Sequence, residues 1–176
     1  MQIIRATAAG FCSGVKGALK TAEQALQEPD LRPGSEPGNR GADRERGKVF
    51  TLGPIVHNRL VVERLKERGI HVAEDLEELR GVPGVRLVIR SHGVGPGILQ
   101  QAEELGIQVI DATCPLVKRV QQIANSLAED GFQVVIIGDP KHPEVTAVLE
   151  WTKGQGIVVA DAEEARQIPD CPRIGI

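Results

Sequence analysis

Short apolar runs alternate with amphipathic segments along almost the whole chain, and this alternation limits the choice of fold more than any other feature. We predict strands at the apolar runs 2–6, 49–52, 85–90, 107–110, 132–137 and 156–160. Helical spacing of apolar residues predicts helices at about 13–27, 58–68, 97–105, 115–129, 143–151 and 161–167. Strands that alternate with helices indicate parallel sheets with right-handed crossovers. The predicted fold class is therefore α/β, with two consecutive α/β domains built on small parallel sheets.

The expected division between these domains lies near the glycine-rich stretch 93–97, which gives a first domain at 1–95 and a second at 96–176. The segment 28–47 interrupts the alternation because it is rich in proline, glycine and charge. It offers almost nothing to bury, so we predict a mobile surface insertion there. The final four residues, RIGI, resemble the opening of another strand.

The composition excludes several functional classes. The net charge is -3 and the chain contains three Phe, one Trp and no Tyr, which argues against a nucleic-acid-binding surface. No stretch approaches the roughly 20 apolar residues of a membrane span, and the N-terminus does not have the pattern of a signal peptide. Three cysteines without disulfide-like spacing are typical of a cytoplasmic protein, in which thiols stay reduced.

Five reactive side chains stand where a predicted strand gives way to a loop and then to a helix. They are Cys12, His57, His92, Cys114 and His142. Backbone N–H groups at a helix N-terminus favour anions, including thiolates and phosphates. A lone cysteine is most often buried and inert, and a lone histidine most often has no catalytic role, as we expect for His71. The repeated placement instead predicts one shared site that binds an anion beside a thiolate-bound metal.

The residues alone leave two uses open for the three histidines. Protonated imidazoles would bind a diphosphate through charge-assisted hydrogen bonds. Neutral imidazoles would instead form an open three-histidine zinc site. In either case Glu144, two residues after His142, is a candidate general acid or base.

Five motifs follow one another in the order GFCSGV at 10–15, VHNRLVV at 56–62, SHGV at 91–94, DATCPLV at 111–117 and HPEV at 142–145. Together they resemble the 4-hydroxy-3-methylbut-2-enyl diphosphate reductase family (IspH, also called LytB), whose members catalyse the last step of the non-mevalonate isoprenoid pathway. The resemblance covers nearly the whole chain outside 28–47, and five ordered motifs make it highly specific.

The resemblance implies an oxidoreductase with an oxygen-sensitive [4Fe-4S] cluster held by three cysteines. It implies reductive dehydroxylation of an allylic diphosphate to isopentenyl and dimethylallyl diphosphate, with electrons from a ferredoxin- or flavodoxin-type donor. The implied roles are cluster ligation by Cys12 and Cys114, diphosphate binding by His57, His92 and His142, and proton supply by Glu144.

The same resemblance implies a trefoil-like fold of three α/β domains, of which this chain would contain two. The third cysteine ligand belongs to the absent third domain, and Cys171 is not in the motif that carries it. We expect no functional role for Cys171. A truncated form of this kind should not hold a stable cluster by itself and should be catalytically inactive.

Two further interpretations stay open. A zinc hydrolase would use the three histidines as ligands and Glu144 as base, and would leave Cys12 and Cys114 without a role. A non-catalytic diphosphate-binding module would keep the histidines and lose the redox chemistry.

Overall fold

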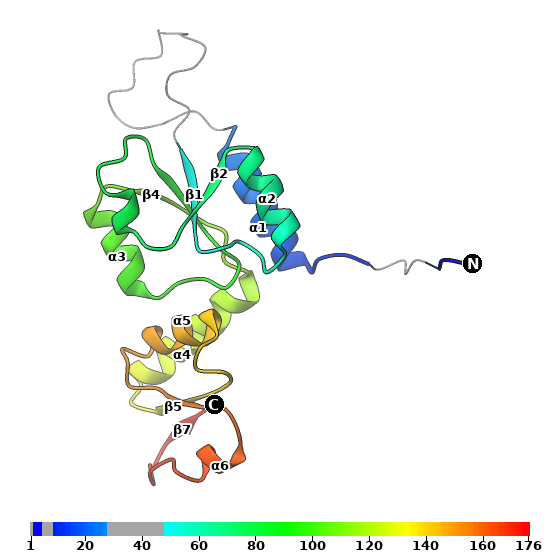
Figure 1. Ribbon diagram of the computed structural model, residues 1–176. Coiled ribbons are helices and arrows are strands. Elements are labelled where there is room, and N and C mark those ends of the chain that lie inside the picture. The colour runs from blue at the N-terminus through cyan, green and yellow to red at the C-terminus, as the bar shows by residue number, and fades with distance from the viewer. Residues whose placement is uncertain (1, 5–8, 28–47) are drawn as a thin grey trace.

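Two separate parallel sheets organise the chain (Figure 1). The computed structural model describes residues 2–4, 9–27 and 48–176. The first sheet has the strand order β2 (Ile70–Ala73), β1 (Val49–Leu52), β3 (Arg86–Ile89) and β4 (Gln108–Asp111). The second has the order β6 (Ile157–Val159), β5 (Gln133–Ile137) and β7 (Ile174–Gly175). All neighbouring strands in both sheets are parallel.

Helices connect the strands. They are α1 (Ser13–Ala25), α2 (Arg59–Glu67), the short 3-10 helix η1 (Glu77–Leu79), α3 (Pro96–Glu104), α4 (Pro115–Glu129), α5 (Pro143–Trp151) and α6 (Ala162–Ala165). The first turns of α3, α4 and α5 each contain a proline, whose missing N–H would have no partner there. The side chain of Asn58 begins α2 by accepting a hydrogen bond from Val61 N–H at 3.3 Å.

The predicted α/β class with small parallel sheets is confirmed, and α4 and α5 have the predicted bounds. Strand β2 was not predicted, because its burial does not alternate and His71 interrupts a run of only four residues. The predicted strand at 2–6 is wrong for 2–4, where Ile3 and Ile4 are exposed and no strand forms. Residues 5 and 6, and the predicted insertion at 28–47, lie outside the described residues.

The first sheet is covered by helices on both faces (Figure 1). Helices α1 and α2 pack on one face, where Val49 and Val88 are fully buried. Helix α3 and η1 pack on the other face, against Leu87 and Ile89. Neighbouring residues of β3 thus enter opposite cores, which explains why this strand is apolar at both alternating positions.

Helices α4 and α5 cover the second sheet on the side toward the first sheet (Figure 1). Ala124 of α4 and Val148 of α5 form its small core with Val134 of β5. The indole N–H of Trp151 donates a hydrogen bond of 3.1 Å to the backbone oxygen of Val94. This bond ties the end of α5 to the loop that follows β3.

The change from one sheet to the other comes after β4, along α4. Strand β4 pairs with β3 from Arg86–Gln108 to Ile89–Asp111, so it belongs to the first sheet. We therefore propose a domain boundary after Asp111, in place of the expected boundary at 95/96. The glycine-rich stretch 93–97 instead forms the turn into α3. No helix in the described part of the chain has the length and apolarity needed to cross a membrane.

Candidate functional site

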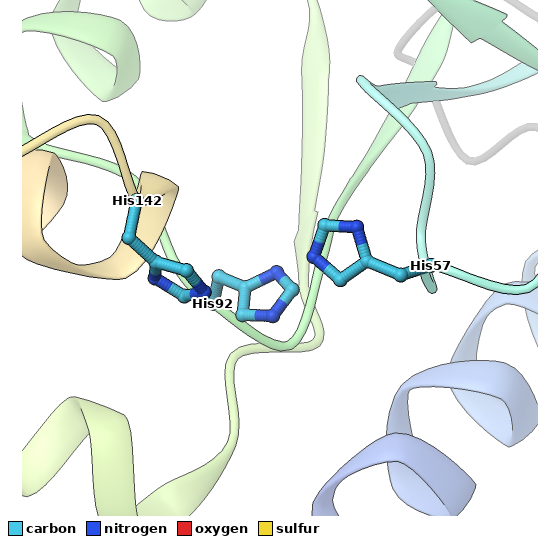
Figure 2. Close-up of side chains that lie close together, drawn as sticks. All are labelled: His57, His92 and His142. Carbon is cyan, nitrogen blue, oxygen red and sulfur yellow. The ribbon is translucent and has the colours of Figure 1, made fainter. Parts of the chain in front are cut away.

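Three histidines from separate parts of the chain meet beside the ends of their strands. His57 lies in the loop after β1, His92 in the loop after β3, and His142 at the N-cap of α5, which follows β5. Figure 2 shows the three rings grouped together although they come from both sheets. The carboxyl ends of parallel strands are the usual place for a binding site in α/β proteins, because loops and helix N-termini gather there.

The three imidazoles are close enough to contact one small ligand. The ring centroids are 5.2 Å apart for His57 and His92, 5.5 Å for His92 and His142, and 6.4 Å for His57 and His142. One nitrogen of each ring lies within 4.8 Å of a nitrogen of the other two. His57 is exposed and the other two are half-buried, so the cluster opens to solvent on the His57 side.

A backbone hydrogen bond sets the ring orientation and the neutral tautomer of His142. Its Nδ1 accepts a hydrogen bond of 3.2 Å from the backbone N–H of Glu144. An imidazole nitrogen that accepts carries no proton, so the remaining proton of the neutral ring is on Nε2. His142 therefore offers an N–H donor from Nε2, and its ring orientation is set by the first turn of α5.

The surroundings of His92 lower its pKa. Burial, together with the positive charge of Arg90 and the neighbouring His57 and His142, lowers the pKa of His92 from 6.5 to about 4. The ring is therefore neutral at pH 7. Its Nδ1 is buried and has no hydrogen-bond partner within the described ranges. Buried polar atoms without a partner are rare, and this one fits a site that a ligand or water completes.

The low pKa of His92 predicts that the free energy of unfolding decreases as the pH is lowered. Between pH 6.5 and 4 the unfolded chain protonates this histidine and the folded chain does not, so the unfolded state binds more protons. We expect the Tm to fall from pH 7 to pH 4.5, and to fall less in His92→Gln. Thermal unfolding across this range, with His71→Gln as the matched control, measures the difference. Equal slopes for the natural chain and His92→Gln would contradict the lowered pKa.

Cys114 lies directly beside the loop of His92. Its backbone N–H donates a hydrogen bond of 3.0 Å to the backbone oxygen of the buried Ser91. The N–H of Ala112 likewise bonds to the oxygen of Ile89 at 3.2 Å, so the pairing of β3 and β4 continues into both loops. The structure therefore joins the turn of the predicted ligand Cys114 to that of His92.

Cys114 also contacts the helix that begins at Cys12. A Cβ atom built on Gly14 would lie 2.6 Å from the sulfur of Cys114, so only glycine allows this approach. Cys12 and Cys114 are the N-cap residues of α1 and α4, and neither side chain makes a capping hydrogen bond. Both cysteines are free thiols. The helix that begins at Cys12 thus packs directly on Cys114.

Of the three other residues considered in the sequence, one lies next to His142 and two lie elsewhere. Glu144 is half-buried in the first turn of α5, two residues from His142. Cys171 lies in the loop between α6 and β7, where its sulfur is 2.8 Å from the backbone oxygen of Pro169. His71 lies on β2 with its ring 5.5 Å from that of Phe50 and is not part of the three-histidine cluster.

Some residues that shape the site were not singled out from the sequence. Ser91 contributes its backbone oxygen, and Gly14 contributes its lack of a side chain. Neither contribution can be recognised from the chemistry of a side chain in the sequence. Asp111 accepts hydrogen bonds from Thr113 N–H at 2.9 Å and from Lys118 at 2.5 Å. Partial burial acts to raise the pKa of Asp111, but these bonds lower it below its ordinary value. In the sequence, Asp111 could have been recognised from its position between the predicted strand 107–110 and Cys114.

A family model described as "LytB protein" matches residues 3–176. The chain belongs to the LytB family. The chain is similar to two relatives named 4-hydroxy-3-methylbut-2-enyl diphosphate reductase. One, from Geobacter sulfurreducens, is 39% identical over 176 residues, which are 100% of this chain and 55% of the relative. The other, from Dictyoglomus thermophilum, is 40% identical over 171 residues and is covered to 53%.

Solved LytB-type structures have the same fold. One, described as (E)-4-hydroxy-3-methyl-but-2-enyl diphosphate reductase, the terminal enzyme of the non-mevalonate pathway, matches with a TM-score of 0.72 and 38% identity. It covers 94% of this chain and 53% of the solved chain. A reductase structure from Plasmodium falciparum matches with a TM-score of 0.80 and 25% identity, over 96% and 48% of the two chains. The chain thus spans about half the length of these relatives.

Proposed function

We propose that this chain is the diphosphate-recognising and cluster-binding part of a 4-hydroxy-3-methylbut-2-enyl diphosphate reductase. The observation that carries the proposal is the meeting of three histidines, within 4.8 Å of one another, beside the turn of Cys114. Membership of the LytB family and the names of the relatives supply the substrate class. The reaction would be reductive dehydroxylation of the allylic diphosphate to isopentenyl and dimethylallyl diphosphate.

His57, His92 and His142 would bind the diphosphate. His142 would donate from Nε2, because its Nδ1 is engaged by Glu144 N–H. His92 is neutral at pH 7 before binding, and an adjacent diphosphate would favour its protonated form and so raise its pKa. The N-terminus of α5 would add the positive end of its dipole to the same anion. Diphosphate binding should therefore be accompanied by proton uptake near neutral pH.

Cys12 and Cys114 would hold a [4Fe-4S] cluster. Their chemistry fits the group, since iron–sulfur clusters take cysteine thiolates and both of these thiols are free at helix N-termini. The fit is incomplete: the third cysteine of the chain, Cys171, is in the loop before β7 and hydrogen-bonds to Pro169 O. We therefore expect the 176-residue chain alone to hold no stable cluster and to show no turnover. When bound, the cluster would supply the two electrons of the reduction.

Glu144 would supply protons. Glu144 lies in the first turn of α5, two residues after His142, so one helix terminus would both hold the anion and present the acid. Electrons would reach the cluster from a ferredoxin- or flavodoxin-type donor. Thiolate ligands need a reducing compartment, and we place the chain in the cytoplasm.

Metal analysis after anaerobic incubation of the chain with iron, sulfide and zinc together tests the proposal against its rival. We expect iron and acid-labile sulfide below one cluster per chain, and pyrophosphate binding measured by calorimetry. The three clustered imidazoles and the neutral state of His92 favour one alternative, a three-histidine zinc site. Stoichiometric zinc without sulfide would support that alternative and contradict the reductase proposal. Pyrophosphate binding with neither metal would support a binding module.

A further inference from the structure

An ion pair between Asp111 and Lys118 bridges the turn that contains Cys114. Asp111 ends β4, and its carboxylate accepts a hydrogen bond of 2.9 Å from the backbone N–H of Thr113. The same carboxylate contacts the ammonium group of Lys118 at 2.5 Å. Lys118 lies on the first turn of α4, and its own N–H donates to the backbone oxygen of Cys114 at 2.9 Å. Asp111 and Lys118 therefore meet across Cys114. Asp111 bonds to Thr113, which precedes Cys114, and Lys118 bonds to the backbone oxygen of Cys114 itself.

The exposure of this ion pair fits a role in positioning Cys114 better than a role in stabilising the fold. The side chains of Asp111 and Lys118 are 40% and 54% exposed. Ion pairs of that exposure contribute little to the free energy of unfolding, typically about 0–1 kcal/mol. The thiol of Cys114 makes no capping hydrogen bond of its own, so its direction is set by the backbone of the turn. A change in that turn would move the sulfur away from Gly14.

We propose that Asp111 and Lys118 are positioning residues that hold the Cys114 sulfur against the N-terminus of α1, next to Cys12. This inference rests on the proposed role of Cys114 as a cluster ligand and adds the residues that set its geometry. Asp111 fixes the turn through Thr113, and Lys118 closes it from the helix side. The hydrogen bond from Cys114 N–H to Ser91 O then carries the same constraint to the loop of His92.

The test measures the rate at which Cys114 in the metal-free chain reacts with iodoacetamide. Peptide mass spectrometry identifies which cysteine has been alkylated, so none of the three cysteines has to be replaced. Asp111→Ala removes both hydrogen bonds and should speed alkylation of Cys114 by about fivefold, the effect of about one hydrogen bond. Asp111→Asn keeps an oxygen that accepts from Thr113 N–H and should restore most of the natural rate. Lys118→Met should give an intermediate increase.

Two controls separate positioning from general destabilisation. Glu163→Gln removes a comparable exposed ion pair, with Arg166 at 2.6 Å on α6, and should leave the alkylation rate unchanged. Thermal unfolding of Asp111→Ala and Asp111→Asn should give the same Tm within a few degrees. An unchanged Cys114 rate in Asp111→Ala, or the same increase in Glu163→Gln, would overturn the proposal. So would an Asp111→Asn rate as high as that of Asp111→Ala. Alkylation needs no cluster, so stoichiometric zinc without sulfide would count against the reductase proposal and not against this one.

Discussion

Replacement of His57 by alanine is expected to weaken pyrophosphate binding by roughly ten- to hundredfold. Hydrogen bonds to charged groups contribute about 1.5–3 kcal/mol, and His57 is the solvent-exposed member of the three-histidine cluster. The fourth histidine, His71, lies against Phe50 and outside the cluster, so no other imidazole takes the place of His57. Isothermal calorimetry with inorganic pyrophosphate on the metal-free chain measures the loss directly.

The matched control is His71→Ala, because His71 is a histidine of the same sheet that lies outside the cluster, against Phe50. Its affinity for pyrophosphate should equal that of the natural chain. A double replacement of Cys12 and Cys114 by serine should likewise keep pyrophosphate affinity, since neither thiol is required for the anion. Equal binding by the His57→Ala and His71→Ala variants would end the case for a diphosphate site at the histidines.

Replacement of Cys114 by serine is expected to remove the iron and sulfide, less than one cluster per chain, that the chain takes up during anaerobic reconstitution without holding a stable cluster. A serine hydroxyl is a much poorer ligand for iron–sulfur clusters than a thiolate. Cys114 is bonded to the His92 loop through Ser91 and packed against Gly14, so the replacement removes the proposed ligand that is joined to the loop of a histidine. Iron and acid-labile sulfide per chain are the measured quantities.

Cys171→Ser provides the matched control for this result. Cys171 lies in the loop between α6 and β7, and iron content should not change when it is replaced. If Cys171→Ser lost iron as completely as Cys114→Ser, Cys171 would be a ligand and its expected lack of function would be wrong. Full cluster occupancy with turnover by the natural 176-residue chain would contradict the expectation that this chain is inactive alone.

The sequence predicted the parallel α/β architecture because each strand–helix unit carries its own local signals. Apolar runs and first-turn prolines located α4 and α5 to the residue. Strand β2 was not predicted because an edge strand of four residues can form with little hydrophobic periodicity when it pairs with β1. The sheet to which β4 belongs is a long-range property that the local sequence does not contain. Glycine marks turns as readily as linkers, and the stretch 93–97 forms the turn into α3.

The candidate site was predictable as far as its reactive side chains. The position of His57, His92 and His142 after separate strands predicted that they meet, and their rings do meet. The roles of Cys12, Cys114 and Glu144 remain predictions. The neutral state of His92 depends on burial and on Arg90, and the contact of Cys114 with Gly14 depends on how two helices cross. Neither can be derived from spacing along the chain.

The bond between Trp151 and the oxygen of Val94 gives this chain an intrinsic optical probe. Trp151 is its single tryptophan and there is no tyrosine, so ultraviolet emission arises almost wholly from one indole. That indole lies at the C-terminal end of the helix that begins at His142, and it bonds to Val94, two residues along the chain from His92. A movement of this helix away from the loop of His92 would break the bond, and the indole fluorescence would record the movement without a label.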